Sequence, residues 1–211
     1  MTPRIRSALS WLTAAALVVA GWLIVQAAPG DDVYWETFYR NVSVGEDAEI
    51  AMARVSVLDI RAAEAVSDSS GWESDVEGSS GNDSVWILLD LRVEGRYTSP
   101  ADDTTTPEEY RDIAYFATDA LEAGGDTFSP SERPQDSFGG YGEGFALGKA
   151  KTGTYAYEVP ASVLDLARAR VVLAQPLQAS MQEAIAVEFD PRALELRPHA
   201  EVLDTVEEPA R

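Results

Sequence analysis

Few residues of this 211-residue chain have the type and spacing that catalysis or ligand binding requires. His199 is the only histidine and cysteine is absent, so the sequence excludes disulfides, thiolate metal sites and thiol nucleophiles. A hydrolase triad or a zinc site needs an imidazole that a rigid scaffold holds beside its partners. His199 instead follows Pro198 in a charged C-terminal stretch, and we interpret it as a solvent-exposed side chain.

A run of glycines before Lys149 has a superficial likeness to a phosphate-binding loop. Such a loop needs a glycine five residues before the glycine of its Gly-Lys pair, and a serine or threonine after the lysine. Relative to Gly148 and Lys149, these positions hold Glu143 and Ala150. The run therefore predicts a loop between strands, and we predict no nucleotide partner.

Nine of the 36 acidic side chains form two clusters in polar stretches, residues 67–84 and 98–109. Carboxylate oxygens are suitable Ca²⁺ ligands, but neither stretch has the spacing of an ordered calcium loop. A glycosidase would need two carboxylates on opposite walls of a cleft, a geometry that spacing along the chain does not specify. We interpret both stretches as solvated loops and predict no catalytic, cofactor-binding or metal-binding residue. Calcium binding by the loops, and hydrolysis of an envelope polymer by acidic residues, stay as alternatives.

Three aromatic residues, Trp72, Phe138 and Tyr141, lie among glycines and acids in long polar stretches. Aromatic side chains on loops are frequent anchors in interfaces. We therefore predict that these three residues contact a protein or glycan partner, with packing inside the loops as the alternative.

Residues 7–28 form an apolar run without a charged residue, long enough for a helix to cross the roughly 30 Å hydrocarbon core of a bilayer. Two arginines precede the run, and Asp31 and Asp32 follow it, so the positive-inside rule places the N-terminus in the cytoplasm. We predict a single-pass protein of the plasma membrane whose C-terminal domain is extracytoplasmic. A signal peptide cleaved after Ala27 is the alternative, but its apolar region would be unusually long.

The chain carries 36 acidic and 16 basic side chains, a formal net charge of −20. A field of this sign repels nucleic acid and anionic lipid headgroups, so no nucleic-acid partner is expected. The expected partners are the membrane, through residues 7–28, and another membrane or envelope protein.

Alternation of apolar and polar residues indicates a series of short β-strands, clearest at residues 85–93. The expected core residues are Val85, Ile87, Leu89, Leu91, Val93, Tyr155, Tyr157, Val171 and Leu173. Between residues 50 and 66 the alternation changes phase at Leu58, as a β-bulge would make it do, although the alanine-rich end of this segment also suits a helix. Further strands are expected at 113–118, at 121–128 around a Gly124-Gly125 turn, between Gly148 and Pro160, at 169–174 and at 183–189.

Four segments in order, SVWILLDLRVEG, IAYFATDALEAGGDTF, LGKAKTGTYAYEVP and ARVVL, resemble the telokin-like, immunoglobulin-fold domains of exported or membrane-anchored bacterial proteins of unknown function. The matching positions are 85–93, 119–128, 147–160 and 171–173. The resemblance implies an immunoglobulin-like sandwich and brings no catalytic residue. Two departures are the long stretch 67–84 and Glu94-Gly95, where the family often has asparagine.

Together, the patterns and the resemblance predict an all-β fold, an antiparallel immunoglobulin-like β-sandwich preceded by a single N-terminal transmembrane helix. The expected segments are a cytoplasmic N-terminus at 1–6, the anchor at 7–28, a juxtamembrane connector at 29–41, the β-sandwich at 42–190 and a partly disordered tail at 191–211. The predicted function is that of a membrane-anchored extracytoplasmic interaction module, an accessory subunit or binding protein of the cell envelope, and not an enzyme.

Overall fold

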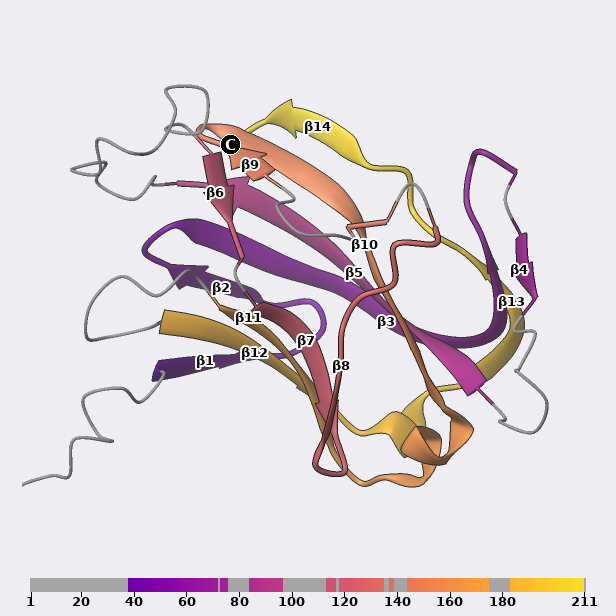
Figure 1. Cartoon of the computed structure of the whole chain (residues 1–211). Helices are drawn as coiled ribbons and strands as arrows, with labels where there is room; N and C mark the ends of the chain where they lie inside the picture. The colour runs from indigo at the N-terminus through magenta and orange to yellow at the C-terminus, as the bar shows by residue number, and fades with distance from the viewer. Residues whose placement is uncertain are drawn as a thin grey trace, which may run out of the picture. The chain divides into compact units, whose positions relative to one another are not determined.

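Two β-sheets packed face to face account for most of the structure (Figure 1). This computed structural model describes residues 38–71, 73–75, 84–96, 113–116, 118–134, 137–138, 144–174 and 183–210. The predicted transmembrane segment, 7–28, lies outside the described residues together with most of the predicted connector. No helix within the described ranges is long and apolar enough to cross a membrane.

The smaller sheet has five strands in the order β1-β12-β11-β7-β8. Their bounds are Phe38–Val42 for β1, Glu183–Phe189 for β12, Ala169–Ala174 for β11, Thr118–Ala123 for β7 and Asp126–Phe128 for β8. Gly124 and Gly125 join β7 to β8 with φ angles of 63° and 95°, which residues with a Cβ rarely adopt. The predicted turn is confirmed.

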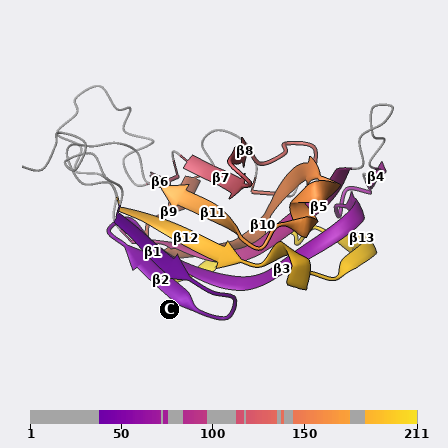
Figure 2. The same ribbon diagram turned by 90° about the horizontal axis from the view of Figure 1, so that it is seen from below.

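The larger sheet has the order β13-β3-β5-β10-β14, and β2 and β4 also pair with β3. The bounds are Leu196–Glu201 for β13, Ala53–Ser67 for β3, Ser84–Gly95 for β5, Lys149–Pro160 for β10, Val206–Pro209 for β14, Asp47–Ile50 for β2 and Glu73–Asp75 for β4. Figure 2 shows the long, curved β3 with β13 beside it. A separate pair is formed by β6 (Ile113–Tyr115) and β9 (Gly144–Ala146), and two 3-10 helices span Ala161–Asp165 and Pro191–Ala193.

The main core lies between the two sheets and takes side chains from both. All nine predicted core residues belong to it, and none is more than 4% exposed. Each alternate side chain of a strand points to the same face, which is why the period of two in the sequence identified them. The prediction of the core is confirmed.

A β-bulge lies where the alternation changes phase. The pairing of β3 with β5 shifts its register between Val57 and Asp59, so Leu58 has no residue opposite it and its side chain is 45% exposed. The bulge returns Ile60 to the inner face. The helical alternative for the alanine-rich end is wrong, because β3 continues to Ser67.

Two pairings depart from the predicted antiparallel arrangement. β1 runs parallel to β12, and β13 runs parallel to β3. Both β1 and β13 lie at the end of their sheet's strand order, while the inner strands pair antiparallel.

The prediction of a partly disordered tail at 191–211 is wrong for the described part of that segment. The chain pairs with β3 through β13 and then with β10 through β14, so it passes from one edge of the larger sheet to the other (Figure 1). Apolar residues are few here and Pro198 interrupts the alternation. Strands this short are stabilised by distant partners, which the local pattern does not reveal.

Candidate functional site

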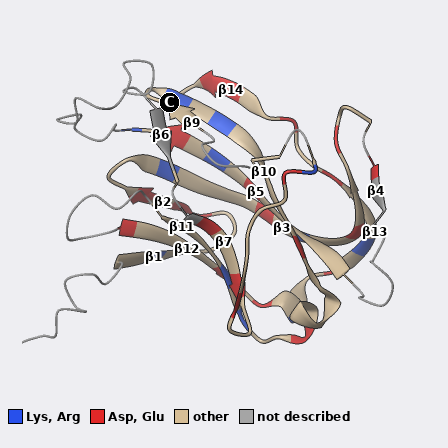
Figure 3. Cartoon of the chain, in the orientation of Figure 1, with Lys and Arg blue, Asp and Glu red and all other residues tan. Residues whose placement is uncertain are grey.

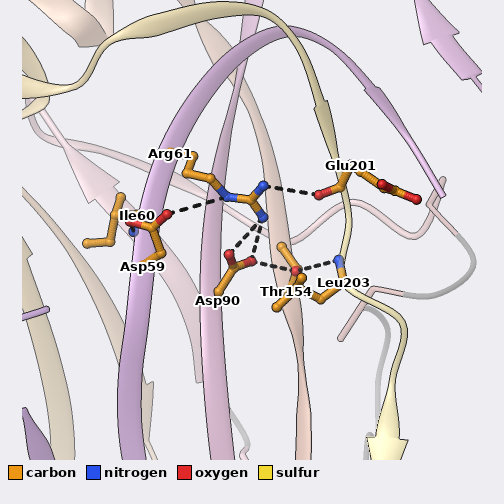
Figure 4. Close-up of polar contacts among 7 residues, drawn as sticks. All are labelled: Asp59, Ile60, Arg61, Asp90, Thr154, Glu201 and Leu203. Carbon is orange, nitrogen blue, oxygen red and sulfur yellow. Dashed lines mark hydrogen bonds and ion pairs between the residues drawn. The ribbon is translucent and has the colours of Figure 1, made fainter. Parts of the chain in front are cut away.

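A buried polar network lies on the outer face of the larger sheet (Figure 4). At its centre is Asp90 of β5, whose two carboxylate oxygens lie 2.8 and 2.7 Å from Nη2 of Arg61 on β3. The hydroxyl of Thr154 on β10 donates to Oδ1 of Asp90 over 2.6 Å. The strand register explains why these three side chains are close together. Thr154 lies directly opposite Asp90, and Arg61 lies opposite Leu88, which is two residues before Asp90 on β5.

The network holds the backbone of the C-terminal segment on both sides of Val202. Nη1 of Arg61 donates to the carbonyl oxygen of Glu201 over 3.2 Å. The backbone N–H of Leu203 donates to the hydroxyl of Thr154 over 3.1 Å. The side chain between these two contacts, Val202, is only 1% exposed.

Val202 belongs to a second apolar cluster, which is separate from the main core. Its members are Ala63, Val66, Trp86, Leu88, Ala156, Ala200 and Val202, none more than 5% exposed. The indole Nε1 of Trp86 is buried and has no hydrogen-bond partner in the described structure. An unpaired buried donor of this kind costs about 1–3 kcal/mol.

The chemistry of this network is recognition of an extended backbone. The negative charge of Asp90 is compensated by the guanidinium of Arg61, and Thr154 is fully buried. Neither the carboxylate of Asp90 nor the hydroxyl of Thr154 is therefore placed to react with a substrate from solution. Instead, the sheet offers a guanidinium to a carbonyl, a hydroxyl to an N–H and apolar surface to the side chain between them. These are the elements with which sheets bind strand-like peptides.

A second pair of titratable side chains faces the space between the sheets, with Tyr157 on β10 of the larger sheet and Asp119 on β7 of the smaller one. The hydroxyl of Tyr157 donates to the backbone carbonyl of Asp119 over 2.9 Å. Burial raises the pKa of the Asp119 carboxyl to about 6 and raises the pKa of Tyr157 well above its ordinary value.

Exposed aromatic side chains lie at the β1 edge of the smaller sheet. Phe38 is 56% exposed and Tyr39 is 44% exposed. Because β1 is the last strand in the order, one side of its backbone has no strand neighbour among the described residues. Within the described ranges, this edge therefore has one side without a paired strand and carries two exposed rings.

Tyr39 is held by a cationic neighbour on the outer face of the smaller sheet. The guanidinium of Arg170 lies 4.7 Å from the centroid of the Tyr39 ring and pairs with Glu122 at 2.7 Å. The hydrogen bond from Arg170 to Glu122 raises the pKa of that guanidinium. An open hollow of about 360 Å³ beside this pair is lined by the β7–β8 hairpin together with Arg168 and Glu188.

Charged side chains of both signs are distributed over the two sheets (Figure 3). Arg54 pairs with Asp47 at 2.5 Å, and hydrogen bonds from Ser56 and Arg54 lower the pKa of that carboxyl. Exposed pairs contribute only about 0–1 kcal/mol each. Burial therefore distinguishes the Arg61–Asp90 pair from the other ion pairs.

The three predicted partner contacts have different outcomes. Trp72 and Tyr141 lie outside the described residues. Phe138 is completely buried, with its ring centroid 5.5 Å from that of Tyr155, so its prediction as a partner contact is wrong. The physical reason is Gly153 on β10, where a Cβ would come within 2.7 Å of the Phe138 ring. The missing side chain leaves room for this loop residue to fold back into the core.

His199 and the acidic stretches offer no metal centre in the ranges that the structure describes. His199 is exposed on β13, and its Nε2 lies 2.8 Å from Oγ of Ser67. Within those ranges, no three side chains of histidine, aspartate or glutamate are grouped to hold an ion. Residues 98–109 and much of 67–84 lie outside them, so calcium binding there stays an untested alternative.

Sequence reasoning missed the network of Arg61, Asp90, Thr154 and Val202. One signal was present, because Asp90 interrupts the most apolar strand of the chain at its middle. A buried carboxylate needs a partner. Neither the cation nor the hydroxyl could be identified before the register of three strands was known.

The fold and this site define a β-sandwich protein whose C-terminal segment is built into its larger sheet. No protein-family model and no curated protein matches the sequence. Among solved structures, the chain is similar to an uncharacterized β-sandwich protein from Clostridium difficile 630, with 11% identity and a TM-score of 0.41 over 72% of this chain and 95% of that one. It is also similar to a candidate lipoprotein from Staphylococcus aureus subsp. aureus NCTC 8325, with 6% identity and a TM-score of 0.36 over 75% of this chain and 97% of that one. Neither likeness assigns a function, and the telokin-like resemblance is not confirmed by them.

Proposed function

We propose that the protein is a membrane-anchored, extracytoplasmic, non-catalytic interaction module that docks a membrane or envelope protein on the β1 edge of its smaller sheet. The observation that carries the proposal is the exposure of Phe38 and Tyr39 on a strand that has one side unpaired in the part of the chain that the structure describes. Proteins normally protect sheet edges with charges, prolines or covering segments. An edge with two exposed rings is therefore suited to a partner strand.

The place of β1 in the chain supports a partner at the membrane. β1 begins ten residues after the predicted span 7–28 would end, and ten residues reach at most about 36 Å, so in an anchored chain this edge could be no farther than that from the end of the span. A partner strand would add main-chain hydrogen bonds, while Phe38 and Tyr39 would supply the aromatic anchors that dominate many interfaces.

We propose in addition that the sandwich is immunoglobulin-like. In such folds strands A, B and E share one sheet and strands C, F and G share the other. Here β3, β5 and β10 are neighbours in one sheet, and β7, β11 and β12 are neighbours in the other. The edge beside β10, where a strand D would pair, is occupied by the C-terminal β14. The strand order thus supports the resemblance found in the sequence.

Site-specific photocrosslinking in the cells that produce the protein tests the docking proposal. A photoreactive phenylalanine analogue is placed at Phe38 of the full-length chain, and the matched control carries it at Val206. Both positions are exposed, at 56% and 48%, and both lie on the last strand of a sheet. We expect a reproducible membrane or envelope protein from position 38 that is absent from position 206. No product from position 38, or the same products from both, would overturn the proposal.

Anchoring and topology need their own measurement. Protease added to intact spheroplasts should digest the domain while leaving the N-terminal segment with the membrane. A mature N-terminus at Ala28 would instead show that the segment is a cleaved signal peptide.

The raised pKa of Asp119 is the observation that favours one competing function, hydrolysis of an envelope polymer by acidic residues. A carboxyl with a pKa of about 6 is suited to act as a general acid near neutral pH. Turnover of an envelope polymer by the purified protein, abolished by Asp119→Asn, would decide for the enzyme. We expect no turnover.

A further inference from the structure

The C-terminal strap, defined as residues 196–209, is attached to the larger sheet by few buried side chains. Among the residues of β13 and β14, only Ala200 is buried, and between the two strands only Val202 is. Both belong to the second apolar cluster and not to the main core. The strap can therefore leave the sheet without opening the core between the two sheets.

The contacts that hold the strap could form equally with any chain that has the same backbone conformation and the same side chains at these positions. Arg61 and Thr154 bind main-chain groups on either side of Val202. At the far edge, Lys149 forms an ion pair with Glu207. Nothing in this set requires that the strap belong to the same molecule as the sheet.

Simple opening of the strap is unfavourable because it uncovers apolar surface. Trp86, Leu88 and Ala156 are at most 1% exposed beneath it. Exposed apolar area costs about 25 cal/mol per Å², and a large patch of it promotes association. A strap that leaves is therefore replaced, and the occupant known to fit is an identical strap.

We propose that two copies of this protein exchange their C-terminal straps, so that the strap of each copy occupies the outer face of the larger sheet of the other. Exchange re-forms every contact of the closed monomer, which makes it a low-cost route to a symmetric dimer. The inference is independent of the docking edge on the smaller sheet.

The absence of cysteine permits a clean disulfide-trapping experiment on the full-length chain. Thr152 of β10 lies directly opposite Val206 of β14. Residues opposite each other in antiparallel strands have Cα atoms about 4.5–5.5 Å apart, within the range of a disulfide. The variant with both Thr152→Cys and Val206→Cys checks this geometry, and it should oxidise to a covalent link between sheet and strap.

The decisive sample mixes two full-length chains by co-expression, one carrying only Thr152→Cys and the other only Val206→Cys. Exchange predicts a disulfide-linked heterodimer on a non-reducing gel, several-fold above a mixture of Thr152→Cys with Leu196→Cys. Leu196 is a matched control because it is a strap residue of similar exposure, 41% against 48%, but pairs with β3 at the opposite edge. A sample that contains only chains with Thr152→Cys measures how much disulfide-linked dimer forms by random collision of that thiol.

Two outcomes would overturn the proposal. The first is complete oxidation of the double variant with no heterodimer above the Leu196→Cys control. The second is a heterodimer that forms equally with both partners, which would show random collision and not register-specific exchange.

Discussion

Replacing Arg61 by methionine tests whether burial gives the polar network its strength. Arg61→Met removes both contacts to Asp90 and the hydrogen bond to the carbonyl of Glu201, while it keeps an unbranched apolar stem. The side chains of Arg61 and Asp90 are 12% and 6% exposed, so water has little access to replace the guanidinium. Asp90 would then remain as a buried carboxylate with only the hydroxyl of Thr154 beside it.

Removal of one partner from a buried ion pair costs about 3–5 kcal/mol of unfolding free energy, because the other charge stays buried. With a slope of about 2 kcal/mol per M in urea, the unfolding midpoint should fall by about 1.5–2.5 M. Urea titration followed by circular dichroism measures the midpoint and the slope together. Since the strap is held by the same guanidinium, amide exchange at Leu203 should become faster in Arg61→Met.

Arg170→Met is the matched control for this prediction. Arg170 and Glu122 are also 2.7 Å apart, but their side chains are 34% and 35% exposed. An exposed pair contributes about 0–1 kcal/mol, and the contact of Arg170 with Tyr39 about 0.5–1 kcal/mol. Equal midpoint shifts for Arg61→Met and Arg170→Met would refute the reasoning from burial.

Three further substitutions test the titration of Asp119 and the packing of the core. Asp119→Asn should match the parent in stability at about pH 4 and exceed it above pH 6, because a folded-state pKa raised to about 6 makes the parent lose stability as the pH rises through that window. A pKa shift of this size corresponds to about 3 kcal/mol of unfolding free energy, reduced to about 1–2 kcal/mol because Asp119 is partly exposed. The measurement is urea unfolding of both proteins at several pH values, and a difference in unfolding free energy that is the same at every pH would contradict the prediction. Gly153→Ala should cost about 1–3 kcal/mol in thermal unfolding, because the new Cβ would lie 2.7 Å from the Phe138 ring, and a second change, Phe138→Leu, should recover part of the loss. Leu89→Asp should abolish the strand signal in circular dichroism because it buries an unpaired charge, while Leu58→Asp on the exposed bulge should fold normally.

The sequence predicts those parts of the fold whose cause is local. Alternation along β5 identifies five buried residues, the change of phase at Leu58 identifies the bulge, and paired glycines identify the β7–β8 turn. Each of these signals arises within about ten residues, from side-chain period or from backbone freedom. Local patterns of this kind are enough to assign a β-sandwich.

Long-range contacts decide the features that the sequence does not predict. Phe138 lies in a stretch of glycines and prolines that reads as an exposed loop, and it is buried only because Gly153 leaves space on a strand that follows it. The strap has weak alternation, and its strands exist because β3 and β10 offer edges to it. Asp90 was visible as an exception in an apolar strand, but Arg61 lies 29 residues before it and Thr154 lies 64 residues after it.

The two sheets protect their outer faces in different ways, and the difference follows from residue size. On the smaller sheet the outward residues Val172, Ala174 and Ala184 are small and form a buried cluster. Tyr39 lies opposite Ala184, and the guanidinium of Arg170 lies over the Tyr39 ring. On the larger sheet the outward residues include Trp86 and Leu88, which are too large for neighbouring side chains to cover. A third layer is therefore needed there, and the strap supplies it with only one valine and one alanine. Because so small a cover rests on so large an apolar surface, its attachment depends on main-chain contacts. These are the pairings of β13 with β3 and of β14 with β10, the hydrogen bond from the N–H of Val202 to the carbonyl of Ser67, and the contacts made by Arg61 and Thr154. The contacts of these two residues would be the same for a strap from either molecule, so weakening them should loosen the cover whichever molecule supplies it.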